Sequence, residues 1–140
     1  MSLPDYNAVM DAISASLAAA MPTRFVSRNL VDPANAKRDE LLAGLLSVVS
    51  ERGGSFATYR GREAQLGQIK VSVVGYLAVA ESTGHADIER AELALLNDLL
   101  TWLSTTAVAG LDTVKPGDWV QSKQLEHPYG WLVLELIVKP

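Results

Sequence analysis

The residues best suited to acid–base or metal chemistry in this sequence are its two histidines, His85 and His127. Histidine titrates near neutral pH and is a common metal ligand, so with acidic residues such as Asp87, Asp118 and Glu126 these rings could form a metal site or an acid–base pair. No His-x-x-x-His or Glu-x-x-His pair supports that reading. His127 precedes a proline in an expected turn and His85 begins an expected helix, and exposed polar residues are common in both places. We therefore expect neither a metal site nor a catalytic histidine.

Motifs for nucleophilic catalysis or phosphate binding are also missing. The stretch "GGSF" lacks the Gly-x-Ser-x-Gly spacing of a nucleophile elbow, and the absence of cysteine excludes a thiolate nucleophile. The surrounding "ERGGSFATYRG" has neither Gly-x-Gly-x-x-Gly nor a Lys-Ser/Thr ending, so it does not match a phosphate-binding loop. We expect no enzyme activity and no cofactor.

The same stretch gathers arginines around aromatic residues. Phe56 and Tyr59 lie between Arg52 and the pair Arg60 and Arg62, a combination that also occurs where proteins bind nucleic acid backbones. Glutamates flank the stretch at both ends and the protein is acidic, which favours contact with a protein partner instead. The expected partner-contact residues here are Arg52, Tyr59, Arg60 and Arg62.

Length and composition predict one domain over residues 1–140. A chain of 140 residues with 49% hydrophobic residues can bury a substantial core. The net charge of -4 argues against general affinity for nucleic acid or an anionic membrane surface. No apolar run approaches the roughly 20 residues needed to span a bilayer as a helix.

Hydrophobic periodicity predicts an α+β fold, mainly an antiparallel sheet packed by two helices and ending in a C-terminal hairpin. By residue number, the expected order is a helix at 4–21, a short strand within 23–33, a strand at 42–51, a long loop at 52–67, a strand at 68–80, a helix at 86–103, a turn at 116–117, and hairpin strands at 118–126 and 131–138. Residues 37–52 are the ambiguous part, because their leucines and valines fit a helix about as well as a buried strand.

The last strand has aliphatic residues on both faces. One face is expected to point into the core and carries Leu132, Leu134, Leu136 and Val138. The other face carries Trp131, Val133, Glu135, Ile137 and Lys139. That second face is too apolar for open solvent and too charged for the centre of a core, so we expect another copy of the protein to cover it, at Trp131, Val133 and Ile137.

The order of elements, with the strand "GQIKVSVVGYLAVA" and the acidic helix "ADIERAELALLNDLLTWL", resembles that of the tail-terminator proteins of long-tailed bacteriophages over nearly the whole chain. The most specific part is the ending "GDWVQSKQLEHPYGWLVLELIVKP". It is similar to the family's last two strands, which are joined by a polar turn ending in a small residue and an aromatic. Residues 37–50 depart from the family pattern, since they are richer in leucine than its second strand requires.

The resemblance implies a homo-oligomeric ring, typically of six copies, that sits on the head-proximal end of the tail tube. Such a ring stops tube polymerisation and presents a surface for joining the head. The implied partners are further copies of the chain, the tail tube protein and a head-completion or connector protein. The implied location is the virion tail, assembled in the bacterial cytoplasm. A neighbouring subunit or the second helix would cover the second face of the last strand, and the loop at 52–67 would become ordered only on assembly.

Two other functions fit the same pattern. The chain could be a different tail or neck component of a phage, since several of these look like variations on one α+β theme. It could also be a small-molecule-binding or regulatory domain with a pocket between the second helix and the sheet. A ring that forms with rising concentration favours the virion functions, whereas a strict monomer with a ligand pocket favours the last.

Overall fold

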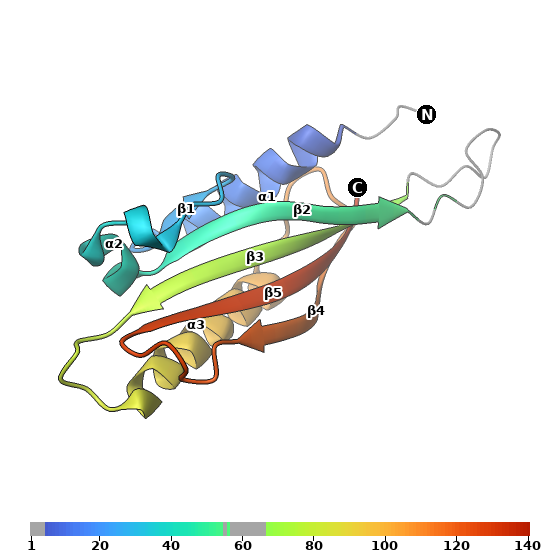
Figure 1. The fold of residues 1–140 in the computed structure, drawn as a ribbon. Helices are drawn as coiled ribbons and strands as arrows, with labels where there is room; N and C mark the ends of the chain where they lie inside the picture. The colour runs from blue at the N-terminus through green and yellow to red at the C-terminus, as the bar shows by residue number, and fades with distance from the viewer. Residues whose placement is uncertain (1–4, 55, 57–66) are drawn as a thin grey trace.

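The structure is a computed structural model that describes residues 5–54, 56 and 67–140 (Figure 1). Its elements in chain order are α1 (Tyr6–Ala20), β1 (Phe25–Ser27), a 3-10 turn η1 (Pro33–Asn35), α2 (Arg38–Ala43), β2 (Leu45–Gly54), β3 (Gln68–Ala78), α3 (His85–Thr105), β4 (Thr113–Gln121) and β5 (Tyr129–Lys139). The predicted α+β class and the C-terminal strand pair are confirmed.

The five strands form a single sheet in the order β1-β2-β3-β5-β4. β1 runs parallel to β2, and every other neighbouring pair is antiparallel. The long strands β3 and β5 lie in the middle of the sheet, whereas β4 forms one edge and the three-residue β1 the other.

The two long helices pack on the same face of the sheet, as Figure 1 shows. This arrangement produces one hydrophobic core, because the apolar side of each helix and one face of the sheet exclude water together. The fully buried side chains at its centre are Ile13, Leu17, Leu46, Val71, Val73, Ile88, Leu95, Leu99, Leu132 and Leu136.

Helix α1 begins at a carboxylate cap and ends before a proline. The Asp5 side chain accepts hydrogen bonds from the backbone N–H groups of Asn7 and Ala8, which the first turn of the helix leaves unpaired. Its buried residues Val9, Met10, Ile13 and Leu17 recur at three- and four-residue spacing. The helix predicted at 4–21 is therefore confirmed, with ends that differ by one or two residues.

The strand predicted at 42–51 is partly wrong, because residues 38–43 form helix α2. Asp39 and Glu40 lie in the first turn of α2, where they interact favourably with the helix dipole. Gly44 ends the helix with φ at +100°, a conformation that L side chains rarely adopt, and β2 starts at the next residue. The ambiguous segment contains both structures in sequence.

Strand β2 also continues to Gly54, so the loop predicted at 52–67 starts later than expected. Residue 55 and residues 57–66 lie outside the described residues, and the expectation that this loop orders on assembly stays a prediction.

The turn predicted at Pro116 and Gly117 is wrong as well, because both residues lie within strand β4. Pro116 pairs with Leu136, and the pairing of β4 with β5 shifts register between Pro116 and Trp119, so a bulge directly follows the proline at Gly117 and Asp118. Proline is tolerated because β4 is an edge strand, where a missing N–H removes no ladder bond on the outer side. The turn of the hairpin covers residues 122–128, so β4 ends earlier than the predicted residue 126.

Helix α3 is longer than predicted and has one well-buried stripe. Ile88, Leu95, Leu99 and Trp102 face the core, and the Trp102 indole N–H donates a 3.0 Å hydrogen bond to the Ser16 hydroxyl on α1. In the adjacent stripe Leu96 is buried, but Leu93 and Leu100 are 38% and 37% exposed. The structure leaves that flank of the helix facing solvent.

Candidate functional site

The two faces of β5 have different surroundings. Leu132, Leu134, Leu136 and Val138 are at most 1% exposed in the core beneath α3, as the alternation predicts. Trp131, Val133 and Ile137 on the opposite face are only partly buried. Because α1 and α3 both lie on the core side, neither of the two long helices packs over this second face, and the short η1 and α2 reach it only near Tyr76 and Trp131 (Figure 1). Coverage by the second helix, one of the two arrangements considered from the sequence, is excluded.

Neighbouring strands extend this surface across the sheet. Val74 and Tyr76 on β3 pair with Val133 and Trp131, so they share their face. Val120 on edge strand β4 pairs with Val133 and is 55% exposed. We call this surface the open sheet face; its apolar members are Val49, Val74, Tyr76, Val120, Trp131, Val133 and Ile137.

Charged residues lie toward the end of the open sheet face away from Trp131. The Lys70 ammonium is 3.4 Å from the Glu135 carboxylate, with both side chains about three-quarters buried. Ladder pairing places four cationic residues on this side of the sheet: Arg52, Lys70, Lys115 and Lys139. Among the described residues, three carboxylates accompany them: Glu135, Asp118 in the β4 bulge opposite Glu135, and Glu51, which accepts a hydrogen bond from the Ser72 hydroxyl. The end is therefore cationic on balance.

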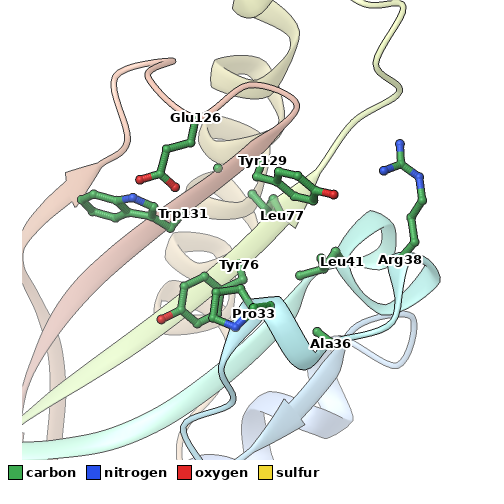
Figure 2. A pocket seen from close by; sticks show the side chains of 11 residues that line it. Pro33, Ala36, Arg38, Leu41, Tyr76, Leu77, Glu126, Tyr129 and Trp131 are labelled. Carbon is green, nitrogen blue, oxygen red and sulfur yellow. The ribbon is translucent and has the colours of Figure 1, made fainter.

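A cavity of about 420 Å³ lies at the other end of the open sheet face. Figure 2 shows the rings of Tyr76, Tyr129 and Trp131 around it, with η1 and α2 forming its opposite wall. Arg38 and Glu126 are the charged residues of its lining. The ligand-binding alternative placed a pocket between the second helix and the sheet, but this cavity lies on the face away from that helix. Its aromatic walls and two opposite charges suit an amphipathic group.

A buried carboxylate holds the hairpin that presents Trp131. Glu92 on α3 is 0% exposed and accepts a 2.5 Å hydrogen bond from the Ser122 hydroxyl, a 3.0 Å bond from the Trp131 backbone N–H and a 3.3 Å bond from the Gln121 amide. Buried charge is costly unless it is well hydrogen-bonded, and these three donors supply that compensation. Glu92 therefore fixes the turn and the start of β5 against the helix.

Gly130 allows this close approach of the hairpin to α3. A Cβ atom at this position would collide with the Glu92 carboxylate and with the Ile88 side chain. The small residue that ends the turn is thus required by the carboxylate beneath it.

The two histidines connect the hairpin turn to the start of α3. Their rings stack in parallel, with centroids 4.6 Å apart. The Thr83 hydroxyl donates its hydrogen to the Ala80 carbonyl at 2.6 Å, so in its 3.2 Å contact with His127 it accepts from Nε2. Among the described residues no group of three His, Asp or Glu side chains is arranged to hold a metal ion.

Four of the seven predicted contact residues lie on one surface. Trp131, Val133 and Ile137 are on the open sheet face, and Arg52 is at its cationic end. Tyr59, Arg60 and Arg62 lie outside the described residues.

Other parts of the surface were missed from the sequence. Val74, Tyr76 and Val120 complete the open sheet face, and Val74 and Tyr76 alternate with core residues in the clearest predicted strand, which was a usable signal. The buried role of Glu92 does have a sequence signal, because Glu92 lies four residues after Ile88 and three before Leu95 in the buried stripe.

Comparison with known proteins does not assign the chain to a family. No protein-family model matches it, and no curated protein sequence is significantly similar to it. Within the described residues, no helix is long and apolar enough to cross a membrane.

Proposed function

We propose that this protein is a phage tail terminator, a homo-oligomeric ring that caps the head-proximal end of the tail tube. The ring stops addition of tube subunits and offers its other side to the head. This proposal rests on the pattern of elements and the ending of the chain, both of which resemble that family.

The observation that carries the proposal is the open sheet face. Four aliphatic residues, two aromatic rings and an exposed valine on β4 lie together without a long helix over them, on a sheet whose other face is already packed. Contiguous apolar surface of this kind marks a protein-interaction site. A second copy of the chain is the occupant that a ring requires.

The partners follow from the same proposal. One rim of the ring binds the terminal ring of tail tube protein, and the other binds a head-completion or connector protein. The protein then resides in the virion tail after assembly in the host cytoplasm. It acts by binding alone, without a cofactor and without making or breaking covalent bonds.

Tube growth in vitro tests this function. Purified tail tube protein polymerises into long tubes, and addition of the protein at a low molar ratio is expected to stop elongation and leave a ring at one end, visible by negative-stain electron microscopy. Val133→Lys is the matched variant, because it changes the open sheet face and no core residue. Unchanged tube length with wild-type protein from the same phage would contradict the proposal.

The aromatic cavity supports a second candidate, a ligand-binding or regulatory domain. The rings of Tyr76, Tyr129 and Trp131 together with Arg38 and Glu126 offer stacking and charge recognition to a small amphipathic molecule. A strictly monomeric protein that binds a small molecule with a change in Trp131 fluorescence would favour this function over ring formation. Another tail or neck component remains within the first class and would form a ring that does not cap tubes.

A further inference from the structure

Three aromatic rings gather at the cavity beside Trp131. Tyr76 on β3 pairs directly with Trp131 on β5, and Tyr129 lies two residues before Trp131 in the same strand. Because side chains alternate along a strand, all three rings lie on one face of the sheet and at one end of it. Figure 2 shows them around a common space.

A carboxylate completes this group. Glu126 lines the same cavity, and its backbone carbonyl accepts a 2.8 Å hydrogen bond from the Tyr129 backbone N–H, so the turn holds the two residues together. Glu126 is exposed and forms no ion pair with any of the described residues. Its carboxylate is therefore available to a ligand in the cavity.

Arg38, the cationic residue of the lining, is bound elsewhere. Its guanidinium donates a 3.1 Å hydrogen bond to the backbone carbonyl of Val79, just beyond the end of β3. In Figure 2 this guanidinium points away from the rings of Tyr76 and Trp131. The Glu126 carboxylate therefore decides which sign of charge the aromatic part of the cavity attracts.

We propose that this cavity binds an alkylated ammonium cation, such as a trimethylammonium group. Aromatic rings attract cations through the negative potential of their faces, and rings gathered around a cation are a usual recognition site for quaternary ammonium groups. The volume of about 420 Å³ lies within the range of small-molecule sites. This inference concerns the cavity and does not depend on the proposed ring.

The rest of the lining favours an alkylated nitrogen over a primary ammonium. A primary ammonium carries three N–H donors, and each donor that is removed from water needs an acceptor. Apart from the rings and the two charged residues, the lining is aliphatic or glycine: Pro33, Ala34, Ala36, Leu41, Leu77 and Gly130. Methyl groups on the nitrogen carry its charge into such a site without needing acceptors.

Titration of the isotope-labelled protein with choline, followed by nuclear magnetic resonance in dilute monomeric solution, tests the proposal. Choline is expected to shift the indole N–H signal of Trp131 with a dissociation constant on the order of 1 mM. Dimethylbutanol, the uncharged isostere in which carbon replaces the nitrogen, is expected to bind at least about tenfold more weakly. Ethanolamine, which has N–H donors in place of the methyl groups, is also expected to bind more weakly than choline. A short peptide with trimethylated lysine distinguishes the sources: tighter binding of the peptide indicates a partner side chain, and tighter binding of choline a free small molecule.

Three variants assign the binding to this cavity. Glu126→Gln keeps the shape and removes the charge, so it is expected to weaken choline binding about threefold to fivefold and to leave dimethylbutanol binding unchanged. Asp118→Asn, a matched control, removes a carboxylate outside the lining and is expected to bind choline as the wild type does. Trp131→Leu keeps an apolar side chain and is expected to lose most of the preference for choline over dimethylbutanol.

Several results would overturn the proposal. Choline that causes no shift up to about 20 mM, or that binds no more tightly than dimethylbutanol or ethanolamine, rules out a site for alkylated ammonium. Tighter binding of dimethylbutyrate, the carboxylate analogue, would make Arg38 the recognising charge and overturn it as well. Normal rings without choline binding overturn this inference alone, whereas a protein that binds choline and stays monomeric at all concentrations overturns only the ring.

Discussion

At the scale of single residues, the carboxylate of Glu92 connects the helix layer to the surface proposed to bind a neighbour. It is buried, forms no ion pair with any of the described residues, and depends on three donors from the hairpin, one of them the backbone N–H of Trp131. The position of Trp131 therefore depends on a residue on the far side of the sheet.

Substitution of Glu92 is expected to destabilise the protein. Glu92→Ala leaves the Ser122 hydroxyl and the Trp131 N–H buried without an acceptor and opens a cavity, which together cost roughly 2–4 kcal/mol of unfolding free energy. Glu92→Gln keeps the shape and one acceptor, so it is expected to lose only about 1–2 kcal/mol. Urea unfolding followed by circular dichroism measures both. Loss of less than about 0.5 kcal/mol in Glu92→Ala would show that the network contributes little.

The histidines are expected to contribute only to local stability. His127→Ala removes the ring stacked on His85 and the contact with Thr83, for a loss on the order of 1 kcal/mol. His85→Ala is expected to behave similarly, and both variants should still form oligomers of wild-type mass by light scattering. A folded, correctly assembled variant that no longer caps tubes would point to a direct role for its missing ring.

At the scale of elements, the two faces of β5 are expected to have different roles. One face packs in the core and stabilises the fold, whereas the other is partly exposed and is proposed to contact a neighbouring copy. Leu134→Lys or Leu136→Lys places an unpaired charge in the core and is expected to cost more than about 4 kcal/mol, enough to unfold the chain. Val133→Lys or Ile137→Lys places the same charge on the open sheet face and is expected to leave a folded monomer. Thermal unfolding and light scattering on the four variants test this difference, and equal unfolding from both pairs would contradict it.

Strand alternation made the core face of β5 predictable, and the three- and four-residue spacing did the same for α1 and α3. The segment before β2 was not predictable in the same way, because leucines and valines at 41–49 satisfy both periods and only the φ of Gly44 divides helix from strand. The position of Pro116 within a strand also depends on β4 being an edge, which is a property of the finished sheet. The sequence could identify Trp131, Val133 and Ile137 as one face of a strand. It could not show which face of the sheet α3 covers, because that too is a property of the finished fold.

At the scale of the whole molecule, both long helices lie on one side of the sheet, and the other side is the surface proposed to bind a neighbour. Apolar burial stabilises by about 25 cal/mol per Å² of surface removed from water, so covering the rings and aliphatic side chains of the open sheet face supplies several kcal/mol toward each contact. Part of that gain offsets the entropy lost when subunits associate, which makes ring formation dependent on concentration.

The ionic strength of the solution is expected to change assembly only moderately. The apolar part of the contact is insensitive to screening, whereas any attraction of carboxylates on a neighbour to the cationic end of the open sheet face weakens as salt rises. Going from about 0.05 M to 0.5 M sodium chloride is expected to weaken association less than tenfold, measured by analytical ultracentrifugation. Complete dissociation at the higher salt would show that charge, and not the apolar surface, holds the ring together.

The most direct test of the central claim is the molar mass of the protein in solution, measured by size-exclusion chromatography with light scattering over a range of concentrations. The account predicts that wild-type protein passes from the 15.1 kDa monomer to one closed species, about 90 kDa for six copies, as concentration rises. Val133→Lys is predicted to stay at the monomer mass throughout. A wild-type protein that remains monomeric at every concentration, or a Val133→Lys variant that assembles as the wild type does, would contradict the claim that the open sheet face joins copies of this chain.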